Sequence, residues 1–189
     1  MNEVNDIDRM CIRQVLSGRK EAYALLVDCY GRDVFRLVAS MVPLKEDAEE
    51  LAQDAFVRAY EQLGQYDERR ASFYTWVSRI AYRLCTDHYR RRPAVWLETD
   101  EKTLQQVSDR EADEMMETDD DERIGRLAEA IRRLPPTERM LVQQHYFEGR
   151  ALKDIAEIVD TDAKTLATRL HRIRKKLFHY ITSHEHGTE

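Results

Sequence analysis

Arginine and aromatic side chains alternate along residues 72–92, SFYTWVSRIAYRLCTDHYRRR. Guanidinium groups neutralise phosphates, and aromatic rings stack on unpaired bases of any identity. On a helical wheel, Tyr82, Thr86 and Tyr89 share one side with flanking arginines, which favours contact with single-stranded or melting DNA. The alternative is that the tyrosines pack against a neighbouring helix. The opposite side is expected to be core, with Phe73, Trp76, Val77, Ile80, Ala81 and Leu84.

A second basic segment, LKDIAEIVDTDAKTLATRLHRIRKKL, predicts a helix-turn-helix at residues 152–177. Asp160 stands at the turn, where many such units have Gly, and Asp tolerates a left-handed or capping conformation. The apolar faces would hold Leu152, Ile155, Ala156 and Val159, then Leu166, Leu170, Ile173 and Leu177. The outer side of the second helix presents Lys164, Thr165, Thr168, Arg169, His171, Arg172 and Lys175. Such a helix fits a DNA major groove; an ordinary amphipathic hairpin is the alternative.

Charge is distributed unevenly along the 189 residues, whose net charge is −6. That total argues against a protein that coats nucleic acid generally. Residues 93–122 are strongly acidic, whereas residues 79–92 and 163–177 are basic, and this asymmetry indicates nucleic acid at the two basic segments. The acidic segment is expected to be a flexible linker.

The cysteines and the apolar runs exclude other classes of protein. Cys11, Cys29 and Cys85 have neither CxxC nor Cys/His ligand spacing, so no disulfide framework or zinc site is expected and a reducing cytoplasm fits best. No apolar run is long enough to span a membrane, so no direct membrane insertion is expected. The polar start MNEVNDIDRM is unlike a signal peptide.

The periodicity predicts an all-α fold with two small helical domains, at residues 8–92 and 123–182, joined by the acidic linker 93–122. In the first domain, a helix through EAYALLVDCYGRDVFRLVASMV contains Gly31 and is closed by Pro43. In the second domain, RIGRLAEAIRRL is amphipathic. The next segment, LPPTERMLVQQHYFEG, starts with prolines that suit a first helical turn and stops at Gly149, an expected C-cap.

The segment KEDAEELAQDAFVRAYEQL predicts a helix with two distinct faces. One face is small and apolar, with Ala48, Ala52, Ala55, Phe56, Ala59 and Leu63. The opposite face is polar, with Asp47, Glu50, Gln53, Asp54, Val57, Arg58 and Glu61. Its carboxylates resemble metal ligands, but the Glu-x-x-His pairing of di-iron helices is missing. A Gly-rich phosphate loop and a paired nucleophile and base are missing too. We therefore expect a solvated or partner-binding face, no catalytic or metal-binding residues, no cofactor and no small-molecule substrate.

Four motifs stand in a recognisable order: DAEELAQDAFVRAY, SFYTWVSRIAYRLCTDHYRR, LPPTERMLVQQHYFEG and LKDIAEIVDTDAKTLATRLHRIRKKL. Together they resemble the extracytoplasmic-function (group 4) branch of bacterial RNA polymerase sigma factors, in the sigma-70 family. The resemblance covers nearly the whole chain apart from the linker and tails. It implies conserved regions 2 and 4 in the two helical domains, which bind core RNA polymerase and place it at promoters to initiate transcription.

The resemblance also assigns roles to residues. Region 2 would bind the clamp helices of the polymerase β′ subunit through Asp47, Glu50, Gln53, Asp54 and Arg58. It would also recognise and melt the −10 promoter element. The loop that holds a flipped base would be Gln65–Ser72, with Gln65, Tyr66, Asp67, Arg69, Arg70 and Ser72. The next helix would contact the opened strands with Arg79, Arg83, Asp87 and Arg90. Region 4 would read the −35 element with the basic helix described above and rest on the β flap.

The family frequently has RIARN where this sequence has Arg83 in place of Asn, which affects the details of the −10 contact. The linker is expected to thread through the polymerase, and an anti-sigma protein is expected to cover regions 2 and 4. One rival is a DNA-binding regulator that acts without polymerase. The first domain weakens that reading, because its sequence indicates a polar acidic face and no apolar pocket. Another rival is a mimic that sequesters an inhibitor, which predicts a degraded DNA-binding surface.

Overall fold

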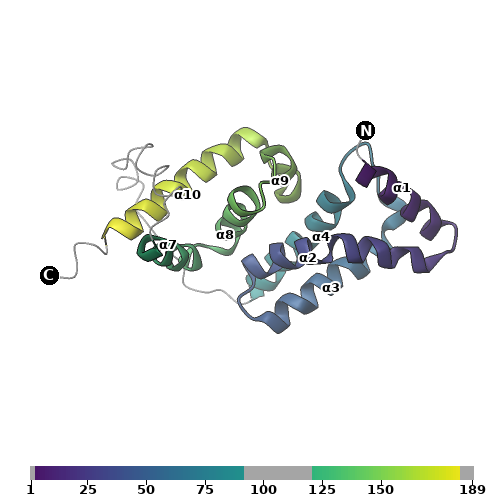
Figure 1. The fold of residues 1–189 in the computed structure, drawn as a ribbon, viewed down its shortest axis with the longest axis horizontal. Coiled ribbons are helices and arrows are strands. Elements are labelled where there is room, and N and C mark those ends of the chain that lie inside the picture. Colours follow the sequence, from purple (N-terminus) through teal and green to yellow (C-terminus); the bar gives the residue numbers. More distant parts are fainter. Residues whose placement is uncertain (1–2, 92–120, 184–189) are drawn as a thin grey trace. The chain divides into compact units, whose positions relative to one another are not determined.

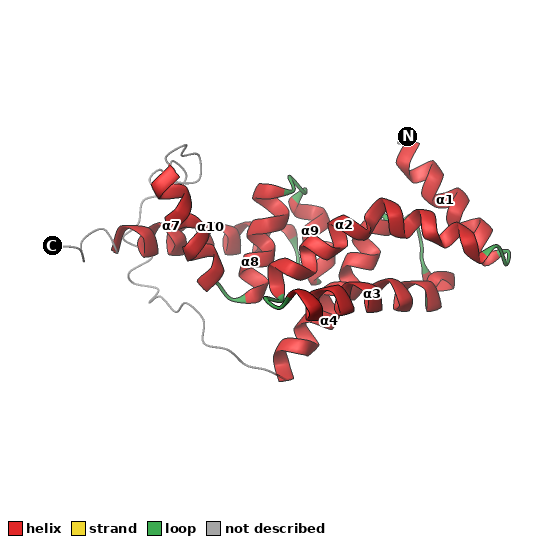
Figure 2. Cartoon of the chain, turned by 60° about the horizontal axis from the view of Figure 1, so that its bottom comes forward, coloured by secondary structure: helices red, strands yellow, loops and turns green. Residues whose placement is uncertain are grey.

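The computed structural model describes residues 3–91 and 121–183 (Figure 1). Every regular element within those ranges is a helix, so the predicted fold class is confirmed (Figure 2). Backbone contacts cluster into two compact units, which are described separately. Residues 93–120 of the predicted linker lie outside the described ranges, and the domain boundaries stay predictions. No helix within the described ranges is long and apolar enough to cross a membrane.

Within the N-terminal unit, residues 3–91 pack as four α-helices (Figure 1). They are α1 (Glu3–Leu16), α2 (Tyr23–Met41), α3 (Lys45–Glu61) and α4 (Phe73–Arg91), with the short 3-10 turns η1 (Lys20–Ala22) and η2 (Leu63–Gln65). Helices α2, α3 and α4 pack pairwise against one another, and α1 packs on α2 and reaches η2. The core of the unit therefore lies among α2, α3 and α4.

Helix ends follow from local backbone chemistry. Gly18, at φ 100°, follows α1, and the Arg19 amide donates to the Gln14 carbonyl at 3.0 Å. This left-handed glycine and its backward hydrogen bond form a Schellman cap, which satisfies a carbonyl of the last turn. Helix α2 runs unbroken through Gly31 and ends at Met41, two residues before the Pro43 that was expected to close it. Helix α1 was not predicted from the sequence.

The expected core faces of α3 and α4 are confirmed for most residues. All six small or apolar residues predicted on one face of α3 and just beyond it are buried, and small alanines let neighbouring helices approach closely. On α4, Phe73, Val77, Ala81 and Leu84 are buried as predicted. Trp76 and Ile80, by contrast, are only half-buried. The buried face of α4 also includes Tyr74, Thr75, Ser78 and Cys85.

The C-terminal helices are α7 (Asp121–Arg133), α8 (Pro136–Val142), α9 (Leu152–Val159) and α10 (Ala163–Ser183). A single π-helical segment, η3 (Gln143–Phe147), continues directly from α8. Helix α10 contacts α7 and α8. Pro136 occupies the first turn of α8, where the missing amide hydrogen is harmless. Gly149 has φ 62°, the left-handed conformation expected beyond that helix.

Three residues separate α9 from α10, and the turn is local and well defined. Asp160 adopts φ 60°, and the Thr161 amide donates to the Ala156 carbonyl at 2.9 Å. Asp160 therefore takes the left-handed C′ position of a Schellman cap, a role that glycine fills more often. The prediction that Asp tolerates this conformation is confirmed, and the order helix, tight turn, helix is present.

Candidate functional site

Helix α3 directs most of its predicted partner-binding residues to solvent. Because its alanine face is buried, the opposite face is exposed, and Glu50, Gln53, Asp54 and Arg58 all lie there. Asp47 differs from the others, since only 28% of its side chain is exposed and its Oδ2 lies 3.6 Å from His88 Nε2 of α4. Asp47 therefore supports the packing of α3 on α4 as well as bordering this face.

An apolar groove of about 590 Å³ runs between α2 and α3, beside that polar face. Its lining is Tyr23, Val27, Gly31 and Phe35 from α2, with Glu49, Ala52, Gln53, Phe56, Val57 and Tyr60 from α3. Gln53 and Val57 belong to both the groove and the polar face, and Val57 is 55% exposed. The expectation that the first domain has no apolar pocket is therefore wrong.

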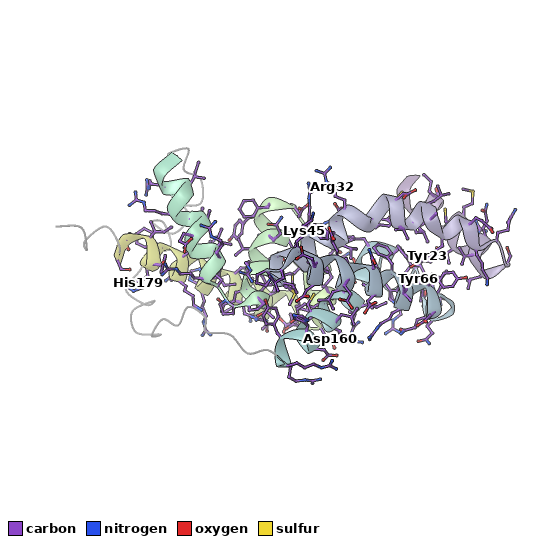
Figure 3. All side chains as sticks on the ribbon, turned by 90° about the horizontal axis from the view of Figure 1, so that it is seen from below. Tyr23, Arg32, Lys45, Tyr66, Asp160 and His179 are labelled. Carbon is purple, nitrogen blue, oxygen red and sulfur yellow. The ribbon has the colours of Figure 1, made fainter. Side chains whose placement is uncertain are left out.

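Two tyrosines, Tyr23 of α2 and Tyr60 of α3, contact each other in the lining of the groove. Tyr23 is labelled in Figure 3. Its hydroxyl donates to the Phe56 carbonyl at 2.7 Å, and its ring meets Tyr60 edge-on with 5.0 Å between centroids. Burial raises the pKa of Tyr23 above its ordinary value, so its hydroxyl remains a donor. The spacing of Val27, Gly31 and Phe35, four residues apart, is the signal from which a groove wall was predictable.

The loop between η2 and α4 holds its own shape through side-chain hydrogen bonds. Tyr66 (labelled in Figure 3) donates its hydroxyl to the Ala71 carbonyl at 3.1 Å. Asp67 Oδ1 accepts from the Arg69 amide at 3.0 Å and from its Nε at 3.1 Å. These bonds with Arg69 hold the pKa of Asp67 below its ordinary value. Ser72 Oγ accepts from the Thr75 amide at 3.1 Å and so caps α4.

The predicted −10 residues in this loop therefore divide into two groups. Tyr66 and Asp67 are half-buried and engaged within the loop; the Tyr66 ring lies 5.3 Å from Trp76 and 5.9 Å from Phe73 between centroids. The exposed members are Gln65, Arg69, Arg70 and Ser72, although Arg69 and Ser72 also make the contacts above. Gln65 and Arg70 thus face solvent, and the Arg69 side chain, although bonded to Asp67, is 86% exposed as well.

Helix α4 carries the remaining predicted −10 residues. Arg83, Asp87 and Arg90 are exposed, Arg79 lies one turn before Arg83, and Arg90 Nη2 is 3.1 Å from Asp87 Oδ1. Tyr89, for which the sequence left two alternatives open, donates its hydroxyl to the carbonyl at the C-terminal end of α2. The packing alternative therefore holds for that tyrosine.

A polar groove of about 280 Å³ lies between α3 and α4. Residues predicted to bind polymerase lie on its α3 side, and a residue predicted to contact the −10 element lies on its α4 side. Its walls are Leu51, Asp54 and Arg58 on one side, with Leu84, Asp87, His88 and Arg91 on the other. Its charges are mixed. No group of three His, Cys, Asp or Glu side chains suited to a metal ion occurs within residues 3–91 and 121–183.

Helix α10 presents the predicted basic surface away from its buried leucine face. Lys164, Thr165, Thr168 and Arg172 are exposed, whereas Arg169, His171 and Lys175 are half-exposed. Leu166, Leu170, Ile173 and Leu177 are buried as predicted. The exposed side chains thus form a surface along the first half of the helix.

Hydrogen bonds within the helix already occupy some of these donors. Asp162 caps α10, accepting from the Thr165 amide at 2.8 Å and from its hydroxyl at 2.6 Å, and these bonds lower the pKa of Asp162. The Thr168 hydroxyl donates to the Lys164 carbonyl at 3.1 Å. Lys176, part of the basic segment but not of the predicted surface, pairs with Glu138 of α8 at 2.9 Å. Among the basic residues of this surface, Lys164 and Arg172 are the exposed ones.

Two family models match this chain. Sigma-70 region 2 matches residues 26–94, and sigma-70 region 4 matches residues 124–177. Among the solved structures, CnrH in complex with the cytosolic domain of CnrY shares 21% identity and a TM-score of 0.65, over 97% of this chain and 99% of that one. The sigma factor RpoE in complex with the anti-sigma factor NepR, from Bartonella quintana, shares 16% identity and a TM-score of 0.60, over 85% and 96%. These structures support the fold.

Curated relatives match over most of their length. The ECF RNA polymerase sigma factor SigW of Bacillus subtilis (strain 168) is 32% identical over 173 residues, covering 88% of this chain and 92% of the relative. The ECF RNA polymerase sigma-E factor of Escherichia coli (strain K12) is 29% identical, with 90% and 92% covered. The chain therefore belongs to the extracytoplasmic-function branch of the sigma-70 family of RNA polymerase sigma factors, which direct promoter-specific transcription initiation.

Proposed function

We propose that the exposed face of α3 and the apolar groove beside it form the surface on which core RNA polymerase docks. The observation that carries this proposal is the continuity of the two, because Gln53 and Val57 belong to both. An apolar centre with a polar rim is the usual anatomy of a protein interface. By the family resemblance, the occupant is the pair of clamp helices of the β′ subunit, with Asp47, Glu50, Gln53, Asp54 and Arg58 as contacts.

DNA is contacted at two places in this proposal. The surface of α10 reads the −35 element, where Lys164, Arg169, Arg172 and Lys175 neutralise phosphates or reach base edges and Thr165, Thr168 and His171 lie beside them. The loop Gln65–Ser72 and α4 hold the −10 element as it opens, with Arg79, Arg83, Asp87 and Arg90 along the opened strands. The second domain also rests on the β flap of the polymerase.

The chain itself performs no catalysis in this scheme, because the polymerase supplies the nucleotidyl-transfer site. It acts in the bacterial cytoplasm, where polymerase and chromosomal DNA meet. An anti-sigma protein is the expected negative regulator, since one sigma factor of the same fold, RpoE of Bartonella quintana, was solved bound to the anti-sigma factor NepR. The anti-sigma protein is expected to bind the polymerase-binding and DNA-binding surfaces and so to prevent both interactions.

The test is purification with bacterial core polymerase, followed by transcription from a pool of promoter DNAs. Asp54→Arg is expected to weaken core association by about tenfold or more, because it reverses a charge on the exposed face of α3. Asp28→Arg, an exposed charge reversal on α2 outside the groove, is the matched control. Arg172→Ala is expected to weaken −35 binding by about 1–3 kcal/mol if it reads a base, while Arg132→Ala on α7 leaves it unchanged.

The outcomes separate the rival readings. Co-elution with start-site-specific transcripts supports the sigma factor mechanism and reveals the promoter. DNA binding without core binding points to a stand-alone regulator. Core binding without transcripts from any promoter leaves only the α3 assignment standing. Equal transcription from the wild type and from Asp54→Arg and Arg172→Ala contradicts the assigned residues.

A further inference from the structure

Helix α1 precedes residues 26–94, the part of the chain that matches sigma-70 region 2, yet it is firmly attached to that body. Cys11, Ile12 and Val15 are buried on one side of α1. Asp8 is also buried, with 4% exposed, and its Oδ2 accepts a hydrogen bond from the Tyr30 hydroxyl of α2 at 2.6 Å. A buried carboxylate with this partner fixes the register of α1 on α2.

The same helix reaches the loop Gln65–Ser72 directly. Arg9 Nε lies 2.6 Å from Glu68 Oε2, and Glu68 stands in the middle of the loop. Asp6 Oδ1, one turn earlier on α1, lies 3.3 Å from Arg9 Nη1 and helps to orient the guanidinium group. Both partners of the ion pair are more than 40% exposed, so its role is in geometry more than in overall stability.

A second, indirect route joins α1 to the loop through aromatic rings. Tyr30, which binds Asp8, has its ring 5.6 Å from that of Phe73 between centroids. Phe73 in turn lies 5.9 Å from the ring of Tyr66 in the loop. A small cavity of about 80 Å³ is lined jointly by Asp8 and Arg9 of α1 and by Tyr66, Glu68 and Ser72. Helix α1 and the loop thus form one packed unit.

We propose that α1 sets the conformation of the loop Gln65–Ser72, and that Arg9 is a positioning residue for promoter opening although it touches no DNA. The role in opening rests on the proposed function, in which the loop holds an unpaired base of the −10 element. The structural part of the proposal, control of the loop by α1, is independent of it.

Hydrogen exchange of the loop amides tests the structural part. In Arg9→Ala, the amides of residues 66–71 are expected to exchange about two- to fivefold faster, the range for an exposed ion pair. Glu68→Ala and the double variant are expected to match Arg9→Ala, because all three lack the same pair. Arg9→Lys keeps the charge and is expected to recover most of the protection. Arg13→Ala, also exposed on α1 and bonded to the Arg9 carbonyl, is the control.

Open-complex formation with core polymerase tests the functional part. The rate of promoter opening is expected to fall by a similar two- to fivefold factor in Arg9→Ala, to recover in Arg9→Lys and to be unchanged in Arg13→Ala, with core affinity constant. Equal loop exchange in the Arg9→Ala and Arg13→Ala variants would overturn control by α1. Faster exchange with an unaltered opening rate would overturn the positioning role. If the wild type opens no promoter, the proposed function fails, while the exchange data still decide the structural part.

Discussion

The Tyr89 hydroxyl donates a hydrogen bond to the Met41 carbonyl oxygen at 2.7 Å, linking the last turn of α4 to the C-terminal end of α2. Carbonyls in the last turn of a helix have no partner within the helix. Tyr89 therefore satisfies a group that would otherwise need water, and its ring packs edge-on against His88 with 5.8 Å between centroids. The aromatic content of α4 thus serves packing at this position.

Tyr89→Phe is expected to lower the free energy of unfolding by about 0.5–1.5 kcal/mol, the net value of one hydrogen bond. Urea denaturation followed by circular dichroism measures it. Under conditions in which the Tyr89→Phe variant remains folded, transcription is expected to be unchanged, because the ring remains. A large loss of promoter opening at unchanged stability would show instead that the hydroxyl contacts DNA.

The three cysteines are expected to differ sharply in reactivity. Cys29 is exposed, whereas Cys11 and Cys85 are buried. Burial raises the pKa of Cys85 to about 12 and also raises that of Cys11, and only the thiolate reacts with alkylating agents. Iodoacetamide at pH 8 should therefore label Cys29 alone in the native protein, and all three cysteines in urea. Mass spectrometry of tryptic peptides checks this, and native labelling of Cys85 would contradict the described packing of α4.

Gly31→Ala is expected to raise the free energy of unfolding by about 0.5–1 kcal/mol, because a glycine inside a helix costs that much relative to alanine. A methyl group there would meet Val27 Cγ1 at an ordinary 3.9 Å. Gly31→Phe instead places a ring in the apolar groove and is expected to reduce affinity for core polymerase. Urea denaturation measures the stability of Gly31→Ala, and a binding titration with core polymerase measures the affinity of Gly31→Phe. Full affinity in the phenylalanine variant would remove the groove from the docking surface.

Periodicity predicted the fold where each helix buries one uninterrupted stripe, as the alanines of α3 and the leucines of α10 do. It missed the apolar groove, because a groove depends on how α2 and α3 sit side by side, and its lining residues are divided between the two helices. The Arg9 and Glu68 ion pair joins residues far apart in sequence, so no local pattern indicates it. Likewise, no sequence pattern distinguishes the polar side chains that bond within the loop, such as Asp67, from those that face outward.

Stability is expected to fall with rising pH through the titration of Asp8. Burial raises the pKa of this carboxyl above its ordinary 3.8, and the Tyr30 hydrogen bond only partly opposes that rise. From about pH 4 upward the unfolded chain therefore loses this proton before the folded chain does, so the free energy of unfolding decreases until the raised pKa is passed. Asp8→Asn removes this dependence, and its stability relative to the wild type should increase from pH 4 to pH 7. A pH-independent difference in urea denaturation would contradict the prediction.

Asp162 connects the stability of α10 with its proposed role on DNA. Asp162→Ala removes the cap that binds the Thr165 amide and hydroxyl, and is expected to cost about 0.5–2 kcal/mol of folding free energy. Asp162→Asn keeps an accepting oxygen, so most of that stability should remain.

Both changes at Asp162 also remove one negative charge beside the basic surface, which favours phosphate binding. Asp162→Asn is therefore expected to bind −35 DNA at least as tightly as the wild type, whereas Asp162→Ala gains less because the first turn of α10 frays. Equal loss of DNA binding in both variants would show that the carboxylate itself takes part in recognition.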